Sequence, residues 1–514
     1  MDDSQPWLNL MDLMAITIAA VMALSIYRFT PFQSRLPLPP GPKSSWFGKI
    51  SLPKTNQWRT YTEWKDIYGD LIYVYVFGNP ILILNSATAA SDLLEKRGSN
   101  YSSRPFRTMV TDLMGWDWLF SGMPYGEFWK RHRNVFHRHF RPNDASPYHL
   151  LQTKETHTLL RNLQYTPENF RYHVRRTAAA IILNVAYGHQ VADEGDDYVT
   201  LADQALSGLA KAGIFGTYLV DYVPILRHIP VWFPFATFRR QALKWRELTR
   251  AMVDQPFEVI LQQMKSGTAT PCLVTEELER RSVGSDFEDE QVIKNVAATL
   301  YAAGSDTFVS GILSFFLVMA LYPDIQQKAQ AELDCVVNGR LPEFCDKKKC
   351  PFIESLCYEL LRWNPVTPMG LAHFATETDE YRGYRIPKGT ALLPNVWGIL
   401  HDPNVYPDPL TFDPMRFMDR KGNVSKGINE LPDAAFGFGR RMCPGRWFAF
   451  DTMWIIVASI LSSYNITKAV DGAGNTIEPE IEYSSGLSHP KPFKCHIAPR
   501  SLDNLSLVEQ TSHL

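Results

Sequence analysis

The stretch from Phe436 to Gly445, Phe-Gly-Phe-Gly-Arg-Arg-Met-Cys-Pro-Gly, surrounds Cys443 with residues that favour chemistry at its sulfur. Three glycines let the backbone adopt positive φ and approach a ligand closely, and a proline stiffens the exit toward a following helix. Backbone amides, together with Arg440 and Arg441, are expected to favour the thiolate of Cys443, and a thiolate is a metal ligand. The alternative is that Cys443 is a small buried hydrophobe. The pattern predicts a loop that holds one cysteine beside a large flat cofactor.

Two further segments carry functional residue types at helical spacing. Trp129 and Arg133 are four residues apart, which places both on one face of a helix; the alternative is a solvated basic helix. Residues 303–307, Ala-Gly-Ser-Asp-Thr, interrupt an apolar helix that follows the capping-box pattern of residues 285–288 and runs to about Leu321. The glycine weakens this helix by about 1 kcal/mol and the polar residues need partners. A functional groove explains them better than a kink or a satisfied buried cluster.

Three more candidates have roles that depend on the fold. Glu359 and Arg362 are three residues apart near the end of a helix and can pair locally, although exposed pairs of this kind contribute little to stability. His373 ends a segment, residues 365–373, in which two prolines exclude helix, so the segment should run extended past the cofactor. The alternative for a lone histidine is a hydrogen-bonded structural role.

The cysteine loop resembles the haem-binding loop of the cytochrome P-450 family, which it matches at Phe436, Gly439, Arg441, Cys443 and Gly445. The resemblance implies that the cofactor is haem b and that the Cys443 sulfur is the axial ligand of its iron. Trp129, Arg133, Arg441 and His373 would bind the haem propionates. The cofactor-binding residues implied in this way are Cys443, Trp129, Arg133, His373, Arg441, Phe436, Gly437, Gly445, Ala303 and Gly304.

The same resemblance implies roles for the remaining candidates. Gly304 would open space over the iron, Thr307 would hydrogen-bond the bound dioxygen, and Asp306 would help to relay protons from solvent. Glu359 and Arg362 would join Arg416 in a structural group that supports the haem loop. Residues 129–141 hold lysine and arginine but no acid, and some of them would receive an acidic reductase. The expected activity is a monooxygenase that uses O2 and electrons from NADPH through NADPH-cytochrome P-450 reductase.

Composition bounds the fold and the partners. With 514 residues, 45% of them hydrophobic, and a formal net charge of -2, the chain can bury a large core, and its charge argues against nucleic acid as a partner. Seven unevenly spaced cysteines do not suggest a disulfide framework. Helical patterns dominate from about residue 87 to 365, with a hairpin at 71–84 and short strands near 381–394 and after 477. We expect a mainly α (α+β) architecture, the cytochrome P-450 fold, with small sheets at one side.

The N-terminal segment predicts a membrane anchor. The chain is mostly apolar from Trp7 to Tyr27, with acidic residues before this run and Arg28 and Arg35 after it. A cleaved signal peptide has a basic start, so we expect a single-pass transmembrane helix with the catalytic domain on the cytosolic side of the endoplasmic reticulum membrane. The expected division is an anchor at 1–30, a proline-rich hinge at 31–45, a catalytic domain at 46–500 and a C-terminal tail at 501–514.

The segments expected to face the substrate are apolar or aromatic, which favours a hydrophobic small molecule. Residues 116–118, Trp-Asp-Trp, and 401–403, His-Asp-Pro, are among those that resemble fungal secondary-metabolism members, the group around O-methylsterigmatocystin oxidoreductase. This resemblance implies oxidation of a terpenoid, with an indole or polyketide scaffold as the alternative. Two other activities stay open: an isomerase or dehydratase acting on a peroxide, and a haem-thiolate sensor or carrier.

Overall fold

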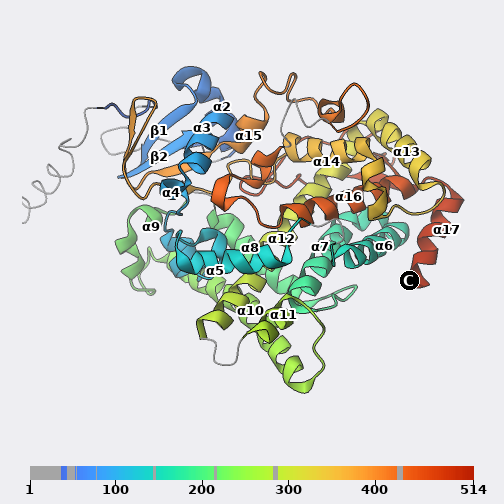
Figure 1. The fold of residues 1–514 in the computed structure, drawn as a ribbon, viewed down its shortest axis with the longest axis horizontal. Coiled ribbons are helices and arrows are strands. Elements are labelled where there is room, and N and C mark those ends of the chain that lie inside the picture. Colours follow the sequence, from blue (N-terminus) through green and yellow to red (C-terminus); the bar gives the residue numbers. More distant parts are fainter. Residues whose placement is uncertain are drawn as a thin grey trace, which may run out of the picture.

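The structure is a computed structural model that describes residues 36–42, 52–53, 55–76, 78–142, 146–213, 217–281, 287–424 and 432–513. Most of these residues form helices, and the largest sheet lies at one side of them (Figure 1). The predicted mainly α fold with small sheets is thereby confirmed. The predicted membrane anchor and the first residues of the predicted capping box, Ser285 and Asp286, lie outside the described residues.

The largest sheet has four strands in the order β1-β2-β6-β3. The predicted hairpin pairs β1 (Leu71–Val76) with β2 (Asn79–Leu84) in antiparallel register, with Leu71 opposite Leu84. β6 (Ala391–Pro394) lies parallel to β2, and the short β3 (His373–Phe374) closes the sheet against β6. Two further sheets have two antiparallel strands each: β4 (Asp379–Tyr381) pairs with β5 (Tyr384–Ile386), and β7 (Tyr464–Lys468) with β8 (Cys495–Pro499).

The helix α12 (Phe287–Leu321) runs through the middle of the domain (Figure 1). Its 35 residues correspond to about 50 Å at 1.5 Å per residue. By length and composition its residues Asp289–Leu321 could cross a membrane, and no other helix in the described part of the chain could. Since 72% of its most apolar window is buried inside the protein, α12 is a core helix. Its main neighbour is α7 (Phe170–Tyr187).

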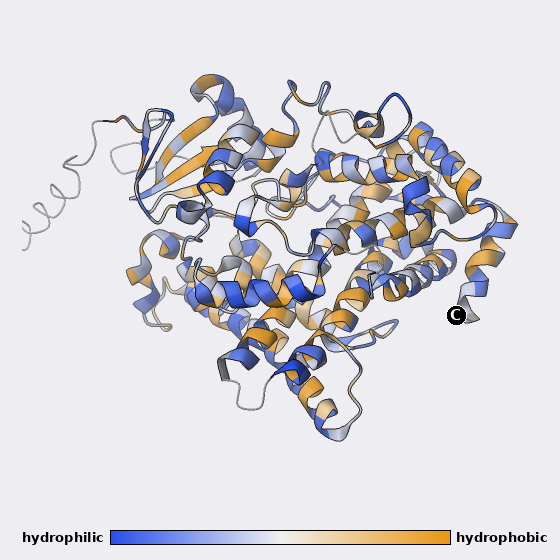
Figure 2. Cartoon of the chain, in the orientation of Figure 1, coloured by the Kyte–Doolittle hydropathy of each residue, from blue (hydrophilic) through white to orange (hydrophobic). Residues whose placement is uncertain are grey.

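Further helices surround α12 and the sheet. Figure 2 colours β1 and β2 as hydrophobic, whereas α5 presents a hydrophilic ribbon. The other helices are α2 (Gln57–Tyr68), α3 (Ala87–Ala90), α4 (Gly98–Tyr101), α5 (Glu127–His139), α6 (His149–Tyr165), α8 (Asp197–Gly213), α9 (Leu219–Tyr222), α10 (Thr237–Ser266), α11 (Leu273–Arg280), α13 (Pro323–Val337), α14 (Pro351–Trp363), α15 (Val396–Leu400), α16 (Arg446–Ser463) and α17 (Leu502–Gln510).

Segments near the two ends of the expected catalytic domain pack onto it. Within the proline-rich segment, residues 36–42 lie along the sheet, where the Tyr73 amide donates to the Pro40 carbonyl at 2.8 Å. The expected tail forms α17, because Ser501 caps its start by accepting from the Asn504 amide at 3.1 Å. Val508 of α17 is buried, and Asn504 also donates to the Ser462 carbonyl at 2.8 Å. Residues 501–513 are therefore a docked helix and a following turn.

Candidate active site

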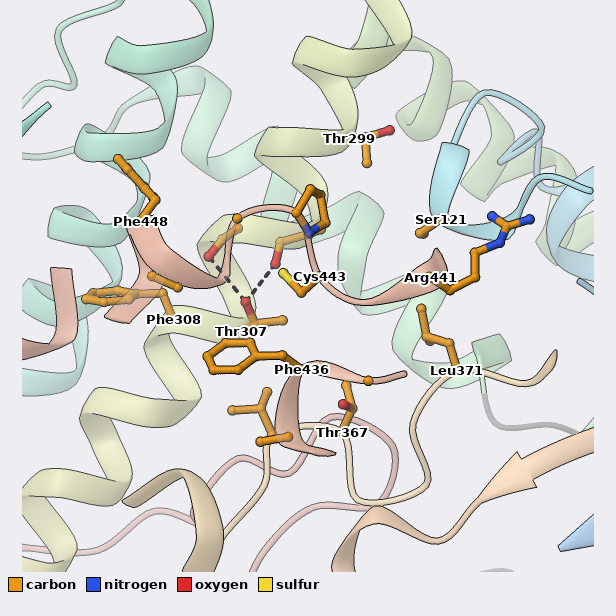
Figure 3. Close-up of a pocket in the computed structure, with 18 of the residues that line it drawn as sticks. Ser121, Thr299, Thr307, Phe308, Thr367, Leu371, Phe436, Arg441, Cys443 and Phe448 are labelled. Atoms are coloured by element: carbon orange, nitrogen blue, oxygen red, sulfur yellow. Dashed lines mark hydrogen bonds between the residues drawn. The ribbon is translucent and has the colours of Figure 1, made fainter. Parts of the chain in front are cut away.

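A cavity of about 320 Å³ lies between α12 and the cysteine loop (Figure 3). Helices α5 and α12, the cysteine loop and the segment leading into β3 all contribute to its wall. The structure thus brings together residues that are far apart in the sequence. The predicted site residues that line the cavity are Trp129, Arg133, Ala303, Gly304, Thr307, His373, Phe436, Gly437, Arg441, Cys443 and Gly445. Asp306 and the three predicted structural residues, Glu359, Arg362 and Arg416, do not line it.

The cysteine loop is closed by its own backbone and seated against a neighbouring turn. The Cys443 amide donates to the Phe436 carbonyl at 2.8 Å, which draws the two ends of the loop together. At Gly439, where φ is +55°, a Cβ would overlap the carbonyl oxygen of Leu94 in the turn Ser91–Lys96. Only glycine satisfies both the conformation and the close approach. The loop therefore presents Cys443 from a fixed position.

The charges that act on Cys443 differ from the prediction. Arg440 is exposed and donates to the Tyr125 hydroxyl at 2.8 Å, and neither it nor Arg441 is among the groups that lower the pKa of the thiol. Burial raises that pKa, and the Gly445 amide, Arg133 and Arg446 counteract part of the rise. The predicted influence of Arg440 and Arg441 is therefore wrong, since the turn Gly439–Arg441 directs both side chains elsewhere.

Three arginines line the cavity, and we call Arg104, Arg133 and Arg441 the cavity arginines. Their guanidinium groups donate to backbone carbonyls: Arg441 to Ser102 at 2.6 Å and Met123 at 2.7 Å, and Arg133 to Met442 at 2.6 Å. Arg104 does the same with Ser121, Leu371 and Ala372. Over the described ranges, none of the three forms an ion pair with a carboxylate.

Burial is the main cause that lowers the pKa of each cavity arginine. It lowers the pKa of Arg104 to about 10, and with the charges of Arg104 and Arg133 it lowers that of Arg441 to about 8. The ring of Trp129 lies 4.3 Å from the Arg441 guanidinium carbon, and its buried indole N–H finds no acceptor among the described residues. A buried donor and unbalanced positive charge in one cavity wall fit a ligand that carries carboxylates. The two propionates of an iron porphyrin meet this requirement, and Cys443 offers a sulfur ligand in the same cavity.

His373 also lines the cavity, and its hydrogen bond defines the tautomer of its ring. It is 3% exposed, and burial and the charge of Arg104 lower its pKa well below the ordinary value, so the ring is neutral. Its Nδ1 lies 2.8 Å from the Tyr101 carbonyl, and because a carbonyl can only accept, Nδ1 carries the proton. Nε2 of the neutral ring is then an acceptor, so His373 could donate to a propionate only after gaining a second proton.

The residues of the predicted groove lie on two different faces of α12. On the cavity face, the Thr307 hydroxyl donates to the Ala303 carbonyl at 2.7 Å (Figure 3). Gly304 allows close packing, because a Cβ there would lie 2.9 Å from the Cδ1 atom of Ile182 on α7. On the other face, Asp306 contacts His489 at 3.2 Å and Arg175 at 3.6 Å. Gly304 therefore sets the distance between two helices as well as opening the cavity.

The third predicted group is complete and lies outside the cavity lining. Arg362 donates to the two carboxylate oxygens of Glu359 at 2.6 and 2.7 Å, and both side chains are fully buried. The Arg416 Nε lies 3.5 Å from Glu359, and the Asp413 amide donates to the same carboxylate at 2.8 Å. This geometry makes Glu359 the centre of a buried structural cluster that ties α14 to residues 411–416.

Sequence reasoning missed two residues of this region. Arg104 is buried in the cavity wall, and His489 contacts Asp306 from a turn near the C-terminus. Neither had a local signal, because their partners are distant in sequence: 267 residues separate Arg104 from Leu371, and 183 separate His489 from Asp306. The role of Arg104 becomes visible only in the folded protein, where it adds to the positive charge of the cavity wall.

A helical domain that presents one cysteine, buried arginines and an unpartnered indole N–H to one cavity has the features of a haem-thiolate protein. The chain belongs to the cytochrome P450 family, because the family model described as cytochrome P450 matches residues 38–497. A cytochrome P450 monooxygenase of Armillaria gallica is 42% identical over 97% of this chain and 99% of its own. Another, of Postia placenta, is 43% identical over 91% of this chain and 92% of its own, and one of Coprinopsis cinerea is 39% identical over 98% of both.

The protein is therefore a cytochrome P450 monooxygenase whose cofactor is haem b. Its reaction uses O2, a small-molecule substrate and electrons from a redox partner. The bound haem supplies the redox and oxygen chemistry. The described residues supply a thiol at one wall, positive charge and hydrogen-bond donors at the rim, and a hydroxyl on α12 at the opposite wall.

Proposed function

We propose that this monooxygenase oxidises a hydrophobic secondary metabolite, a terpenoid, in the cavity between α12 and the cysteine loop. The observation that carries the proposal is the apolar wall of the cavity. Ile182, Leu300, Val366 and Leu371 contribute to it, and no aspartate or glutamate among the described residues lines it. A hydrocarbon skeleton loses no hydration of charged groups on entering such a site. The resemblance to fungal secondary-metabolism members supports the choice of a terpenoid, and membership of the O-methylsterigmatocystin oxidoreductase group stays a prediction.

Within this proposal the cavity residues have distinct roles. Cys443 would hold the haem iron through its sulfur, and the cavity arginines and Trp129 would hold the propionates. Phe436, Gly437 and Gly445 would pack beside the cofactor. Apart from the neighbours of Gly445 in the chain, no atom of the described residues lies within 4 Å of where its Cβ would be, so there is open space at this place. Thr307 would hydrogen-bond dioxygen on the α12 side, and Asp306 would bring protons to it.

The proposed electron donor is NADPH-cytochrome P-450 reductase, docked near the cysteine loop. The tertiary structure modifies the expected docking surface, because Lys130 pairs with Glu127 at 2.6 Å and Arg131 with Asp289 at 2.5 Å. Arg138 pairs with the buried carboxylate of Glu277. Glu127 of α5 itself and two acids from other segments thus offset much of the charge of α5. The exposed Arg141 and Arg440 are the cations we propose for an acidic partner.

We also propose that the protein is bound to the endoplasmic reticulum membrane with its catalytic domain in the cytosol. The apolar run at the N-terminus is the first support for this proposal. An exposed apolar segment that runs from η5 (Pro224–His228) to the start of α10 is a second one, since Ile225, Trp232 and Phe235 are 70–79% exposed. Both features suit an enzyme that takes a hydrophobic substrate from a lipid phase.

The test is expression with the reductase in a host that is fed sesquiterpene hydrocarbons, with mass spectrometry of the products. A product one oxygen atom heavier, formed only with NADPH and reductase, is expected. Cys443→Ala is the matched control, and it should lose both the product and the Soret band of the reduced carbon monoxide complex of thiolate-bound haem. Turnover with hydrogen peroxide alone and none with reductase would contradict the proposal, as would oxidation of indole or polyketide substrates but of no terpene.

A further inference from the structure

The face of α12 that is turned away from the cavity carries a group of charged residues from four elements. Asp306 of α12 contacts the Nε2 atom of His489 at 3.2 Å and Arg175 of α7 at 3.6 Å. Arg175 also pairs with Asp203 of α8 at 2.5 Å. Asp306 and His489 keep 14% and 20% of their side-chain surface exposed. Asp306 therefore lies on the face of α12 that is turned toward solvent, and it remains partly exposed.

The turn that carries His489 is firmly anchored. Ser488, which is 1% exposed, accepts from the Ser310 hydroxyl of α12 at 2.6 Å and donates its own hydroxyl to Asn364 at 2.9 Å. The His489 amide donates to the Ser484 hydroxyl at 3.0 Å. The imidazole is thus held against Asp306 by elements that also form the back of the cavity, since the Ser488 amide donates to the carbonyl of the lining residue Val366 at 2.8 Å.

The two cations that touch Asp306 differ in what they can do. The guanidinium group of Arg175 has no acceptor atom and serves here to balance charge. Histidine gains and loses a proton in the physiological range. Burial opposes ionisation of Asp306, but the hydrogen bond and charge of His489 and the charge of Arg175 hold its pKa below the ordinary value. Asp306 is therefore ionised, and its carboxylate lies within hydrogen-bond distance of the imidazole that would pass it a proton.

We propose that His489 is a positioning residue for Asp306 and the donor that recharges it with protons during turnover. This inference rests on the proposed role of Asp306. The N–H bond at Nε2 of the imidazolium breaks, the proton passes to a carboxylate oxygen of Asp306, and the neutral imidazole regains a proton from solvent. Asp306 carries the proton across α12 to the cavity face, where Thr307 is the next residue. Formation of one water molecule per monooxygenation consumes two such protons.

The other charged groups near His489 already have hydrogen-bond or ion-pair partners. On its own turn Lys491 pairs with Glu482, and Arg171 of α7 donates to the Pro490 carbonyl at 3.1 Å. Arg175 is shared between Asp203 and Asp306. Among the described groups that contact Asp306, His489 is therefore the one whose side chain can both donate and accept a proton. A pH dependence that is lost when His489 is replaced identifies it.

The experiment compares wild type with His489→Gln, using the best terpene substrate and, independently, 7-ethoxycoumarin as a generic probe. With reductase, His489→Gln should form product about 10- to 100-fold more slowly and release more hydrogen peroxide per NADPH. The wild-type rate should fall as pH rises through the histidine range, because the imidazolium is lost, and the variant should be flat. Turnover driven by added hydrogen peroxide, which brings its own protons and oxygen, should stay within about 3-fold. Lys491→Gln, in the same turn, should match wild type.

The outcomes separate proton supply from structural support. Haem content, the carbon monoxide spectrum and the Soret shift on substrate binding should be unchanged in His489→Gln. An equal loss with reductase and with peroxide, or loss of haem, overturns the proposal in favour of a structural role. A wild-type rate and pH profile in His489→Gln also overturns it. If no terpene is oxidised but 7-ethoxycoumarin is, the substrate proposal fails while the test of His489 remains decisive.

Discussion

Two groups of arginines, both largely removed from solvent, differ in how their charge is balanced. Arg362 is fully buried with Glu359, which accepts two of its hydrogen bonds. The cavity arginines Arg104, Arg133 and Arg441 have carbonyl partners and, in the described part of the chain, no carboxylate. The first group is complete within the protein. The second is complete only with an anionic ligand, and this difference distinguishes a structural cluster from a binding site.

The largest expected effect is the loss of stability when the ion pair of Arg362 with Glu359 is broken. Glu359→Ala leaves Arg362 buried without a counter-charge, and we expect the free energy of unfolding to fall by about 3–5 kcal/mol. Urea denaturation of the haem-free protein measures this change. Glu127→Ala, which removes an exposed pair with Lys130, is the matched control and should change stability by less than about 1 kcal/mol. Equal stabilities of the two variants would refute the comparison.

Removing the carboxylates of haem should weaken its binding to the cavity arginines. Haem in which both propionates are methyl esters should bind the haem-free protein about 100-fold more weakly than haem b, because at least one charge-assisted hydrogen bond worth about 1.5–3 kcal/mol is lost for each propionate. Absorbance titration gives both dissociation constants. If haem and its diester bind equally, the cavity arginines do not recognise carboxylates.

Substituting one cavity arginine should affect the ligand more than the fold. Arg133→Met removes one half-buried cation, and we expect haem to dissociate about 10-fold more readily while the stability of the haem-free protein changes by less than about 1 kcal/mol. Transfer of haem to an acceptor globin measures its release. Arg141→Met, at an exposed position just after α5, should behave like wild type. A large loss of stability without haem would place Arg133 in the structural class.

The smallest effect concerns the indole N–H of Trp129. Trp129→Phe keeps a ring against Arg441 and removes only a donor that has no partner within the described structure, so we expect haem affinity to fall about 3- to 10-fold, equivalent to one hydrogen bond. Trp118→Phe is the control, since its buried N–H also lacks a partner but the residue does not line the cavity. Equal haem affinities of the two variants would show that the Trp129 N–H does not reach the ligand.

Local patterns predicted the elements of the site well. The glycines around Cys443 predict a tight loop, the spacing of Trp129 and Arg133 predicts one helical face, and Glu359 with Arg362 predicts a local pair. Each of these depends on residues within one turn or one loop. Such interactions follow from backbone geometry alone, and the structure reproduces all three.

Predictions about surroundings were less reliable, because neighbours in sequence need not be neighbours in space. Arg440 and Arg441 are close to Cys443 in the chain, yet Arg133 and Arg446 act on its thiol. The helix α5 reads as strongly basic, yet Asp289 and Glu277 arrive from other segments to pair with it. These contacts depend on packing of helices that no local pattern specifies.

The sequence by itself determined the class of this protein, the cysteine loop and the long helix opposite it, because these rest on residue type and short-range spacing. Only the tertiary structure decided which charges are balanced. It placed Arg104 in the cavity, turned Asp306 away from it and brought His489 to Asp306 from 183 residues along the chain. Electrostatic balance depends on distance and burial in three dimensions, and it is this balance that identifies the ligand-binding wall.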